Sequence, residues 1–150
     1  MYPHLTAPGT ARGPADAVSS IMSTPVAEIS GRASLMQVAE TLTAAEVGAL
    51  VVVDGVRAIG VVSERDLVRT LAEGEDQDAL TAADLVSSET VWADPADTIG
   101  AVADLMADAE VRHIPLRAGA RTVGMVSIRD ILEVLRNGSD RAPSSPPAPR

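Results

Sequence analysis

A gapless internal duplication is the feature of this sequence that most restricts its fold. When the chain is shifted against itself by 64 residues, residues 21–71 align with residues 85–135 without a gap. The identical pairs cluster late in the two copies and include Gly60 and Gly124, Ser63 and Ser127, Arg65 and Arg129, and Asp66 and Asp130. A repeat at a fixed period of this kind indicates one supersecondary unit that is built twice.

The first helix of each copy is predicted to be amphipathic. Ser34 followed by Gln37 three residues later is a capping-box start, and apolar residues follow at helical spacing. The stripe consists of Leu35, Val38, Ala39 and Leu42 in the first copy and of Ile99, Val102, Ala103 and Met106 in the second. We therefore expect both helices to bury the same face.

Strands and a second helix follow the first helix in both copies. The β-branched runs at 49–53 and 58–62 are joined by Asp54-Gly55, which favours a hairpin. Residues 113–116 and 122–126 repeat this pattern, and each hairpin precedes an apolar helical stretch. With a short strand ahead of the first helix, each copy is predicted to be strand, helix, strand, strand, helix, in an α/β arrangement.

These elements predict a doubled domain with unstructured ends. We expect a disordered segment at 1–16, a first repeat at 17–75, a second at 81–137, and a disordered Pro/Ser tail at 138–150. A repeat of this size buries too little surface to be stable alone. The two repeats should therefore pack sheet against sheet about a pseudo-twofold axis, which creates two equivalent clefts.

The amino-acid composition excludes several classes of function. The chain of 150 residues has no Cys, its 12 basic residues are all Arg, and its formal net charge is −9. A polyanion such as nucleic acid is a poor partner for this charge, and thiolate or lysine chemistry is absent. We expect no catalytic residues, no metal site and no membrane span, and we expect a cytoplasmic protein.

The sequence resembles the cystathionine-β-synthase (CBS) domain family, in which two tandem repeats form one regulatory unit, the Bateman module. The resemblance rests on two motifs and on the helix-then-strand stretches that precede them. The motifs are Gly60-Val61-Val62-Ser63-Glu64-Arg65-Asp66-Leu67 and Gly124-Met125-Val126-Ser127-Ile128-Arg129-Asp130-Ile131. In that family the cleft between repeats commonly holds an adenine nucleotide or a related adenosyl compound.

The resemblance implies a role for each motif residue. Asp66 and Asp130 would accept hydrogen bonds from ribose hydroxyls, and Ser63 and Ser127 would contact phosphate or ribose. Thr24 and Ser88, ahead of each first strand, would add hydroxyl contacts near the same sugar. On spacing alone, Ser-x-x-Asp is equally typical of a helix cap, and the two roles are compatible.

The two copies differ at the start of the strand that follows the first helix. Arg112 and His113 stand where the first copy has Gly48 and Ala49, and they resemble the phosphate ligands of family members. We expect the better phosphate site to combine them with the Asp66 motif across the pseudo-twofold. The alternative is a solvated Arg and a partly buried His.

Three further residues have two interpretations each. Arg65 and Arg129 lie close enough to their motifs to reach a phosphate, but pairing with a nearby carboxylate is more typical of an Arg in a first helical turn. Trp92 would either stack on an adenine ring or cover part of the core or a subunit contact.

Two functions are compatible with these sequence features. The first is a non-catalytic regulatory module that binds AMP, ADP, ATP or another adenosyl compound, requires no cofactor, and signals to an unidentified effector protein. The second is a ligand-free scaffold for dimerisation or protein interaction. In either case the resemblance implies a homodimer formed through apolar helix faces.

Overall fold

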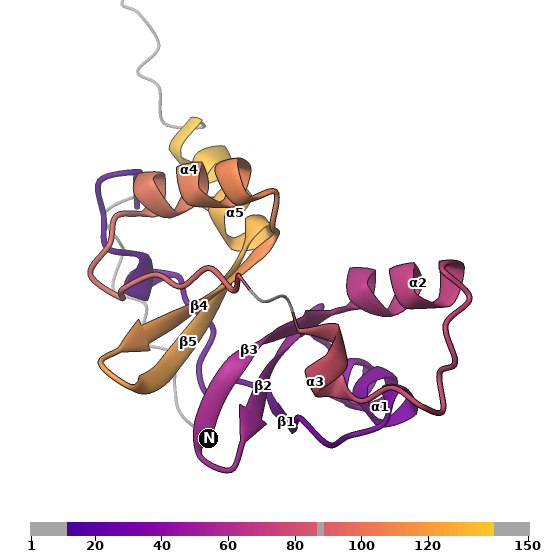
Figure 1. Ribbon diagram of the computed structural model, residues 1–150. Coiled ribbons are helices and arrows are strands. Elements are labelled where there is room, and N and C mark those ends of the chain that lie inside the picture. The colour runs from indigo at the N-terminus through magenta and orange to yellow at the C-terminus, as the bar shows by residue number, and fades with distance from the viewer. Residues whose placement is uncertain (1–11, 87–88, 140–150) are drawn as a thin grey trace, which may run out of the picture.

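The computed structural model describes residues 12–86 and 89–139 and contains two similar halves (Figure 1). The first half has β1 (Glu28–Ser30), α1 (Leu35–Ala45), β2 (Ala49–Asp54), β3 (Arg57–Ser63) and α2 (Glu64–Ala72). The second has α4 (Ile99–Ala109), β4 (His113–Ala118), β5 (Arg121–Ser127) and α5 (Ile128–Ser139). Two short helices, η1 (Val18–Ser20) and α3 (Ala82–Leu85), precede the first and second halves.

Local sequence explains how the first helices begin and end. Ser34 Oγ accepts the amide of Gln37, whose side chain accepts the amide of Ser34, so the expected capping box is present. Leu35, Val38 and Leu42 are buried, as are Ile99, Val102 and Met106 in α4. Both helices end in the left-handed conformation, at Glu46 and at Glu110.

The two sheets differ in their first strand. In the first half, β1 pairs in parallel with β2, and β2 pairs antiparallel with β3. In the second half, β4 and β5 pair antiparallel, and the segment equivalent to β1 contributes only the single parallel bridge between Ala93 and Leu116. Pro115 stands where the first half has Val51, whose amide donates to Ala27, and proline has no amide hydrogen to donate.

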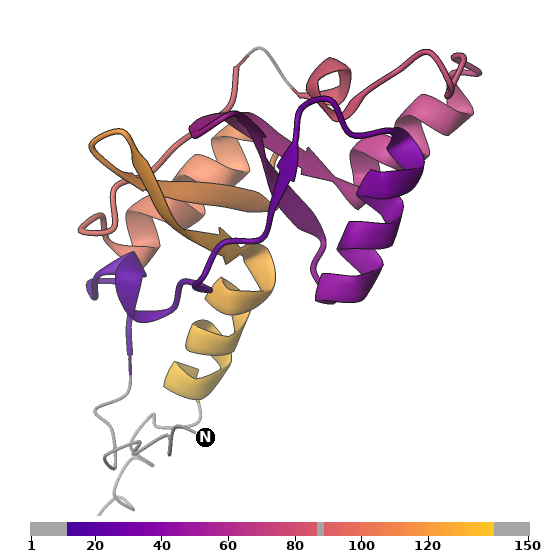
Figure 2. The same cartoon turned by 90° about the horizontal axis from the view of Figure 1, so that it is seen from below.

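The short strand expected around Trp92 is therefore reduced to that bridge. The remaining expected elements are present. Figures 1 and 2 show α1 and α2 on one side of the molecule and α4 and α5 on the other, with the two sheets between them. β3 and β5 are in contact where the halves meet.

Each half completes its core with a segment from the other repeat. Val18, which precedes β1, is fully buried among Ile99, Ile114 and other residues of the second half. Ala82 and Leu85, which precede the second repeat, are buried in the core of the first half. The two cores are thus linked by crossed segments, and neither half is an independent unit.

The predicted disordered ends are partly described. Residues 12–16, which the sequence assigned to the lead, lie against α4, where the carbonyls of Pro14 and Asp16 accept the amides of Gly100 and Ile99. At the other end, α5 includes Gly138 and Ser139, which the sequence assigned to the tail. Residues 1–11 and 140–150 lie outside the described part of the chain.

Candidate functional site

The Ser-x-x-Asp motifs form helix caps in both repeats. Ser63 donates from its amide and its hydroxyl to Asp66 Oδ2 at 2.8 and 2.9 Å, and Ser63 Oγ accepts the amide of Asp66. Ser127 and Asp130 make the same three hydrogen bonds at the start of α5. In each carboxylate the cap uses Oδ2, so the capping role leaves Oδ1 available for another donor.

The second oxygen distinguishes the two aspartates. Arg69 Nη2 donates to Asp66 Oδ1 at 2.8 Å in an ion pair one helical turn along α2. Glu133 occupies the equivalent position on α5, and no ion pair to Asp130 occurs within residues 12–86 and 89–139. The two motifs are therefore not equivalent, because of the two aspartates only Asp66 forms an ion pair within the described residues.

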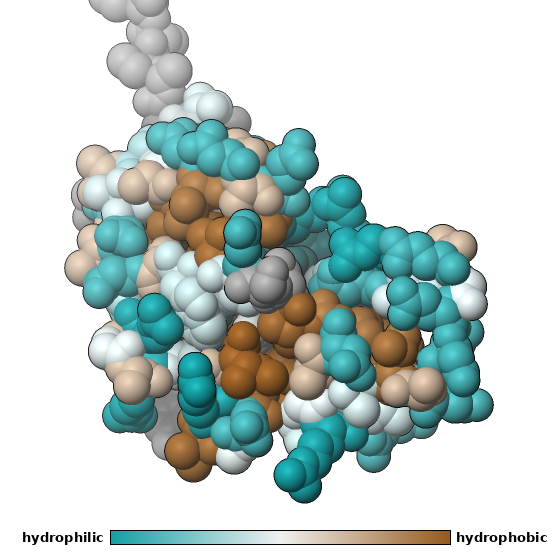
Figure 3. All heavy atoms as spheres, viewed as in Figure 1, coloured by the Kyte–Doolittle hydropathy of each residue, from teal (hydrophilic) through white to brown (hydrophobic). Residues whose placement is uncertain are grey.

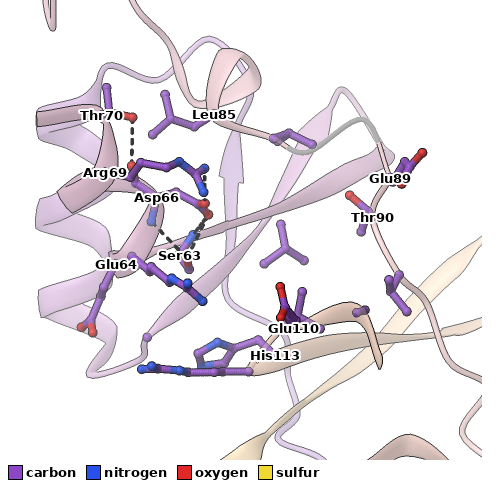
Figure 4. Close-up of a pocket in the computed structure, with 18 of the residues that line it drawn as sticks. Ser63, Glu64, Asp66, Arg69, Thr70, Leu85, Glu89, Thr90, Glu110 and His113 are labelled. Atoms are coloured by element: carbon purple, nitrogen blue, oxygen red, sulfur yellow. Dashed lines mark hydrogen bonds and ion pairs between the residues drawn. The ribbon is translucent and has the colours of Figure 1, made fainter. Parts of the chain in front are cut away.

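A cavity of about 970 Å³ lies beside the first motif. Figure 4 shows Ser63, Asp66 and Arg69 along one side of it, Glu110 and His113 along another, and Glu89 and Thr90 on the segment that crosses between the halves. Arg112 also lines this cavity. The structure thus brings the Asp66 motif of one repeat together with the Arg112-His113 pair of the other.

Three other predicted residues do not belong to this cavity. Thr24 is exposed and lies outside the lining, as do Ser127 and Asp130 of the second motif. Ser88 lies outside the described residues. The binding roles of Thr24, Ser88, Ser127 and Asp130 stay predictions.

His113 is packed against the backbone of the first repeat. A methyl group added to Gly48 would lie 3.1 Å from His113 Nε2, so the imidazole covers this glycine closely. Burial lowers the pKa of His113, and this outweighs Glu64, Asp130 and Asp66, which raise it, while Arg112 lowers it further. At neutral pH the ring is uncharged, so it offers a hydrogen bond to a ligand and not a cation to a phosphate.

The two motif glycines, Gly60 and Gly124, lie directly against other segments of the protein. Their close neighbours are protein segments, because a Cβ at Gly60 would lie 2.6 Å from Thr90 Oγ1 and a Cβ at Gly124 would lie 2.5 Å from the Met22 sulfur. Both neighbours belong to the segments that cross between the halves. Glycine at these positions allows the crossing segments to lie directly on β3 and β5.

Other candidates of the sequence are placed as follows. The guanidinium of Arg117 lies 4.7 Å from the centroid of the Trp92 ring, and Trp92 is not part of the cavity lining. No group of three or more metal-ligating side chains occurs in the part of the chain that the structure describes. Among those residues, no helix has the length and apolar character needed to cross a bilayer.

Most lining residues were not selected from the sequence, among them Arg69 and Glu110. Arg69 follows Asp66 by three residues, a spacing that permits an ion pair on a helix. In the sequence, Glu110 is notable only because it is identical to Glu46, the residue at the equivalent position of the first copy. Its position at the cavity depends on the crossing of the halves, which one repeat alone does not reveal.

Comparison with known proteins gives one family and several relatives. The model of the CBS domain matches residues 18–73 and again residues 82–137. An uncharacterized 33.4 kDa protein from Thermofilum pendens is 33% identical over 102 residues, which are 67% of this chain and 33% of that protein. An A-adding tRNA nucleotidyltransferase from Geobacter sulfurreducens is 28% identical over 128 residues, 85% of this chain and 14% of the enzyme.

This chain therefore spans a third or less of the length of those two relatives. Among solved structures, the CBS domain pair of protein MJ0100, in complex with 5′-methylthioadenosine and S-adenosyl-L-methionine, superposes with a TM-score of 0.76. The identity is 22%, and the match covers 85% of this chain and all of that one. At this identity the likeness concerns the fold.

Proposed function

This chain belongs to the CBS domain family, and from that premise we propose that it is a non-catalytic regulatory module that binds an adenosyl compound between its two repeats. The observation that carries the proposal is the cavity in which Ser63 and Asp66 of the first repeat face residues of the second. A small molecule in this space contacts both halves at once, so its binding free energy depends on how the halves are arranged.

The start of α2 supplies the chemistry for a ribose. A vicinal diol donates two hydrogen bonds to a carboxylate, and such charge-assisted bonds are stronger than neutral ones. Asp66 keeps Oδ2 for the cap, and ribose would take Oδ1 from Arg69. Replacing the Arg69 ion pair by ribose hydroxyls costs little free energy, because Arg69 is mostly exposed and such ion pairs contribute at most about 1 kcal/mol.

The family and the MJ0100 complex support an adenosyl ligand, and AMP, ADP, ATP and S-adenosyl compounds are the candidates. Arg65, Arg112 and the Arg69 released from Asp66 are the lining cations that a phosphate would meet. An effector protein would then detect the liganded state.

Ligand-induced thermal stabilisation tests the proposal. A ligand present at about 100 times its dissociation constant should add about 2.7 kcal/mol to the free energy of unfolding. We expect Asp66→Ala to abolish this increment. Because the substitution also removes a helix cap, Gln37→Ala is the matched control: it removes the equivalent capping side chain from α1, away from the cavity.

The control variant Gln37→Ala should have a lower melting temperature without ligand. It should still gain the same free energy of unfolding when the ligand is added. If no adenosyl compound stabilises the native chain, the ligand-binding function is wrong and the scaffold function takes its place. If Asp66→Ala retains the full increment, the ligand binds elsewhere.

We further infer that two copies associate through the outer faces of α2 and α5. Large apolar side chains are exposed at equivalent positions of the two helices: Val68 and Leu71 on α2, and Leu132 and Leu135 on α5. Leu71 is 53% exposed and Leu135 is 48% exposed. A surface repeated by the pseudo-twofold suits a symmetric homodimer, since both halves contribute the same chemistry to the interface.

A further inference from the structure

The Asp66 carboxylate is fixed by its helix cap. Its Oδ2 accepts the amide and the hydroxyl of Ser63, and the amide of Asp66 donates to Ser63 Oγ. The side chain is only 20% exposed, so both of its oxygens keep their positions at the start of α2 while the cap is intact. Any ligand that binds Asp66 therefore has to reach Oδ1 in this fixed position.

Arg69 already occupies that oxygen. Its Nη2 donates to Asp66 Oδ1 at 2.8 Å, and Figure 4 shows this contact at the wall of the cavity. The Arg69 side chain is 56% exposed, and Figure 3 shows hydrophilic side chains over α2, beside the hollow between the two halves. Of the two partners, Arg69 is therefore the one that can move.

The second repeat shows that the ion pair is not required by the cap. Glu133 stands at the position equivalent to Arg69, yet Ser127 and Asp130 make the same three hydrogen bonds. Asp130 makes no ion pair within residues 12–86 and 89–139. Since the cap forms without a neighbouring guanidinium, Arg69 is not needed to hold Asp66 in place, and its effect is on Oδ1.

A ribose at Asp66 would displace this guanidinium. The ribose hydroxyls are neutral, so they take Oδ1 and leave Arg69 without the carboxylate that it had. A ligand that also carries an anionic group, such as a phosphate, replaces the lost partner by a charge-assisted hydrogen bond. A neutral ribonucleoside offers no such replacement.

We propose that Arg69 determines which adenosyl ligands bind at Asp66, because it competes with a neutral nucleoside for Oδ1 and assists a ligand whose anionic group accepts the displaced guanidinium. The proposal rests on the proposed function, since it takes ribose binding at Asp66 as given. It gives Arg69 opposite effects on the two kinds of ligand. A residue that only supported the helix would change both affinities in the same direction.

Isothermal titration calorimetry of the full chain with adenosine and with AMP tests the proposal, since the two ligands differ by the phosphate. In Arg69→Gln we expect adenosine to bind about two- to fivefold more tightly, because the competing ion pair is gone. We expect AMP to bind more weakly by a factor of about three or more, because a charge-assisted hydrogen bond is lost. Arg69→Lys keeps the charge and should restore part of the preference for AMP.

Arg32→Gln is the matched control, because it removes the same charge from an exposed position between β1 and α1 that does not line the cavity. It should leave the ratio of the two affinities unchanged. If Arg32→Gln changes this ratio as much as Arg69→Gln does, the net charge of the chain sets the preference, and the proposal is wrong.

Added salt gives a second readout of the competition. Sodium chloride at about 1 M shortens the screening length to about 3 Å and weakens an exposed ion pair. Adenosine has no net charge, so its affinity for the native chain should rise with salt as the pair between Arg69 and Asp66 weakens. Arg69→Gln should show no such rise. A rise of equal size in both chains, or in neither, would contradict the competition.

The remaining outcomes separate this proposal from the function beneath it. If the native chain binds adenosine more tightly than AMP, or binds only other adenosyl compounds, the role of Arg69 is wrong while the adenosyl-binding function stands. The same holds if Arg69→Gln shifts both affinities in one direction or shifts neither. If no adenosyl compound binds, both are wrong. If the two affinities shift in opposite directions and Asp66→Ala abolishes binding of both ligands, both are supported.

Discussion

At the scale of single residues, the two repeats are alike in their caps and different in what surrounds them. Asp66 and Asp130 receive the same hydrogen bonds from their serines, but Arg69 reaches the first and Glu133 takes its place beside the second. His113 likewise has Ala49 as its counterpart. The duplication thus kept the helix caps and changed the residues around them, so the two motifs differ in their charged neighbours.

The partly buried His113 makes the stability of the fold depend on pH. Burial lowers its pKa from 6.5, so the unfolded chain binds a proton at higher pH than the folded chain. Stability is therefore fully present above about pH 6.5 and decreases as the pH falls below that value. Thermal unfolding between about pH 7.5 and 5.5 should show this decrease.

In the same thermal unfolding experiment, His113→Gln should reduce the dependence of stability on pH. His4→Gln is the control, since His4 is the only other histidine in the chain, and it should leave the slope unchanged. A native slope that persists in His113→Gln would show that His113 does not cause the dependence of stability on pH.

At the scale of elements, each half depends on a crossing segment that lies on a glycine. Gly60→Ala places a Cβ against Val86 and Thr90, and it should lower the free energy of unfolding by about 1–3 kcal/mol. Gly124→Ala should cost less, because its neighbour is the flexible side chain of Met22. Urea denaturation followed by circular dichroism measures both.

The control for these two substitutions is Gly138→Ala on α5, where no atom lies within 4 Å of an added Cβ. It should leave stability unchanged or raise it by up to about 1 kcal/mol, because alanine favours the helix. If Gly60→Ala has the same small effect as Gly138→Ala, the crossing segment does not constrain β3.

Prediction from sequence succeeded where the pattern is local. The apolar stripes of α1 and α4, the capping box at Ser34 and the two hairpins follow from residue spacing within about a dozen positions. The reduced strand near Trp92 was missed because its cause, the missing donor of Pro115, lies on a partner strand more than 20 residues later.

The candidate site was only partly predictable for the same reason. Ser63, Asp66, Arg112 and His113 were selected from the motif and its resemblance, and they do line one cavity. The uncharged state of His113, the position of Glu110 in the lining and the contact of Gly60 with Val86 depend on how the repeats pack. Those properties arise from pairs of residues that are distant in sequence, so they required the structure.

At the scale of the whole molecule, the outer faces of α2 and α5 leave apolar side chains exposed. Leu71→Glu together with Leu135→Glu should convert the proposed homodimer into a monomer, because each places a charge in an interface that excludes water. Size-exclusion chromatography with light scattering measures the mass. Circular dichroism of the variant should stay unchanged, since neither side chain belongs to a core.

Val56→Glu is the matched control for the interface, since Val56 is fully exposed in the turn between β2 and β3. It should leave the mass of the native assembly unchanged. A native chain that is already monomeric, or a double variant that stays dimeric, would contradict association through these helices.

The exchange of short segments between the halves also governs the order in which the chain can mature. On the ribosome, the amino-terminal repeat emerges without Ala82 and Leu85, so its interior stays open until the start of the second repeat has been synthesised. Val18 is synthesised early, but the core that buries it can form only after α4 and α5 have left the exit tunnel. Native structure is therefore completed only after α5 has been synthesised, and a nascent chain arrested between the repeats would expose both unfinished interiors to proteases and chaperones.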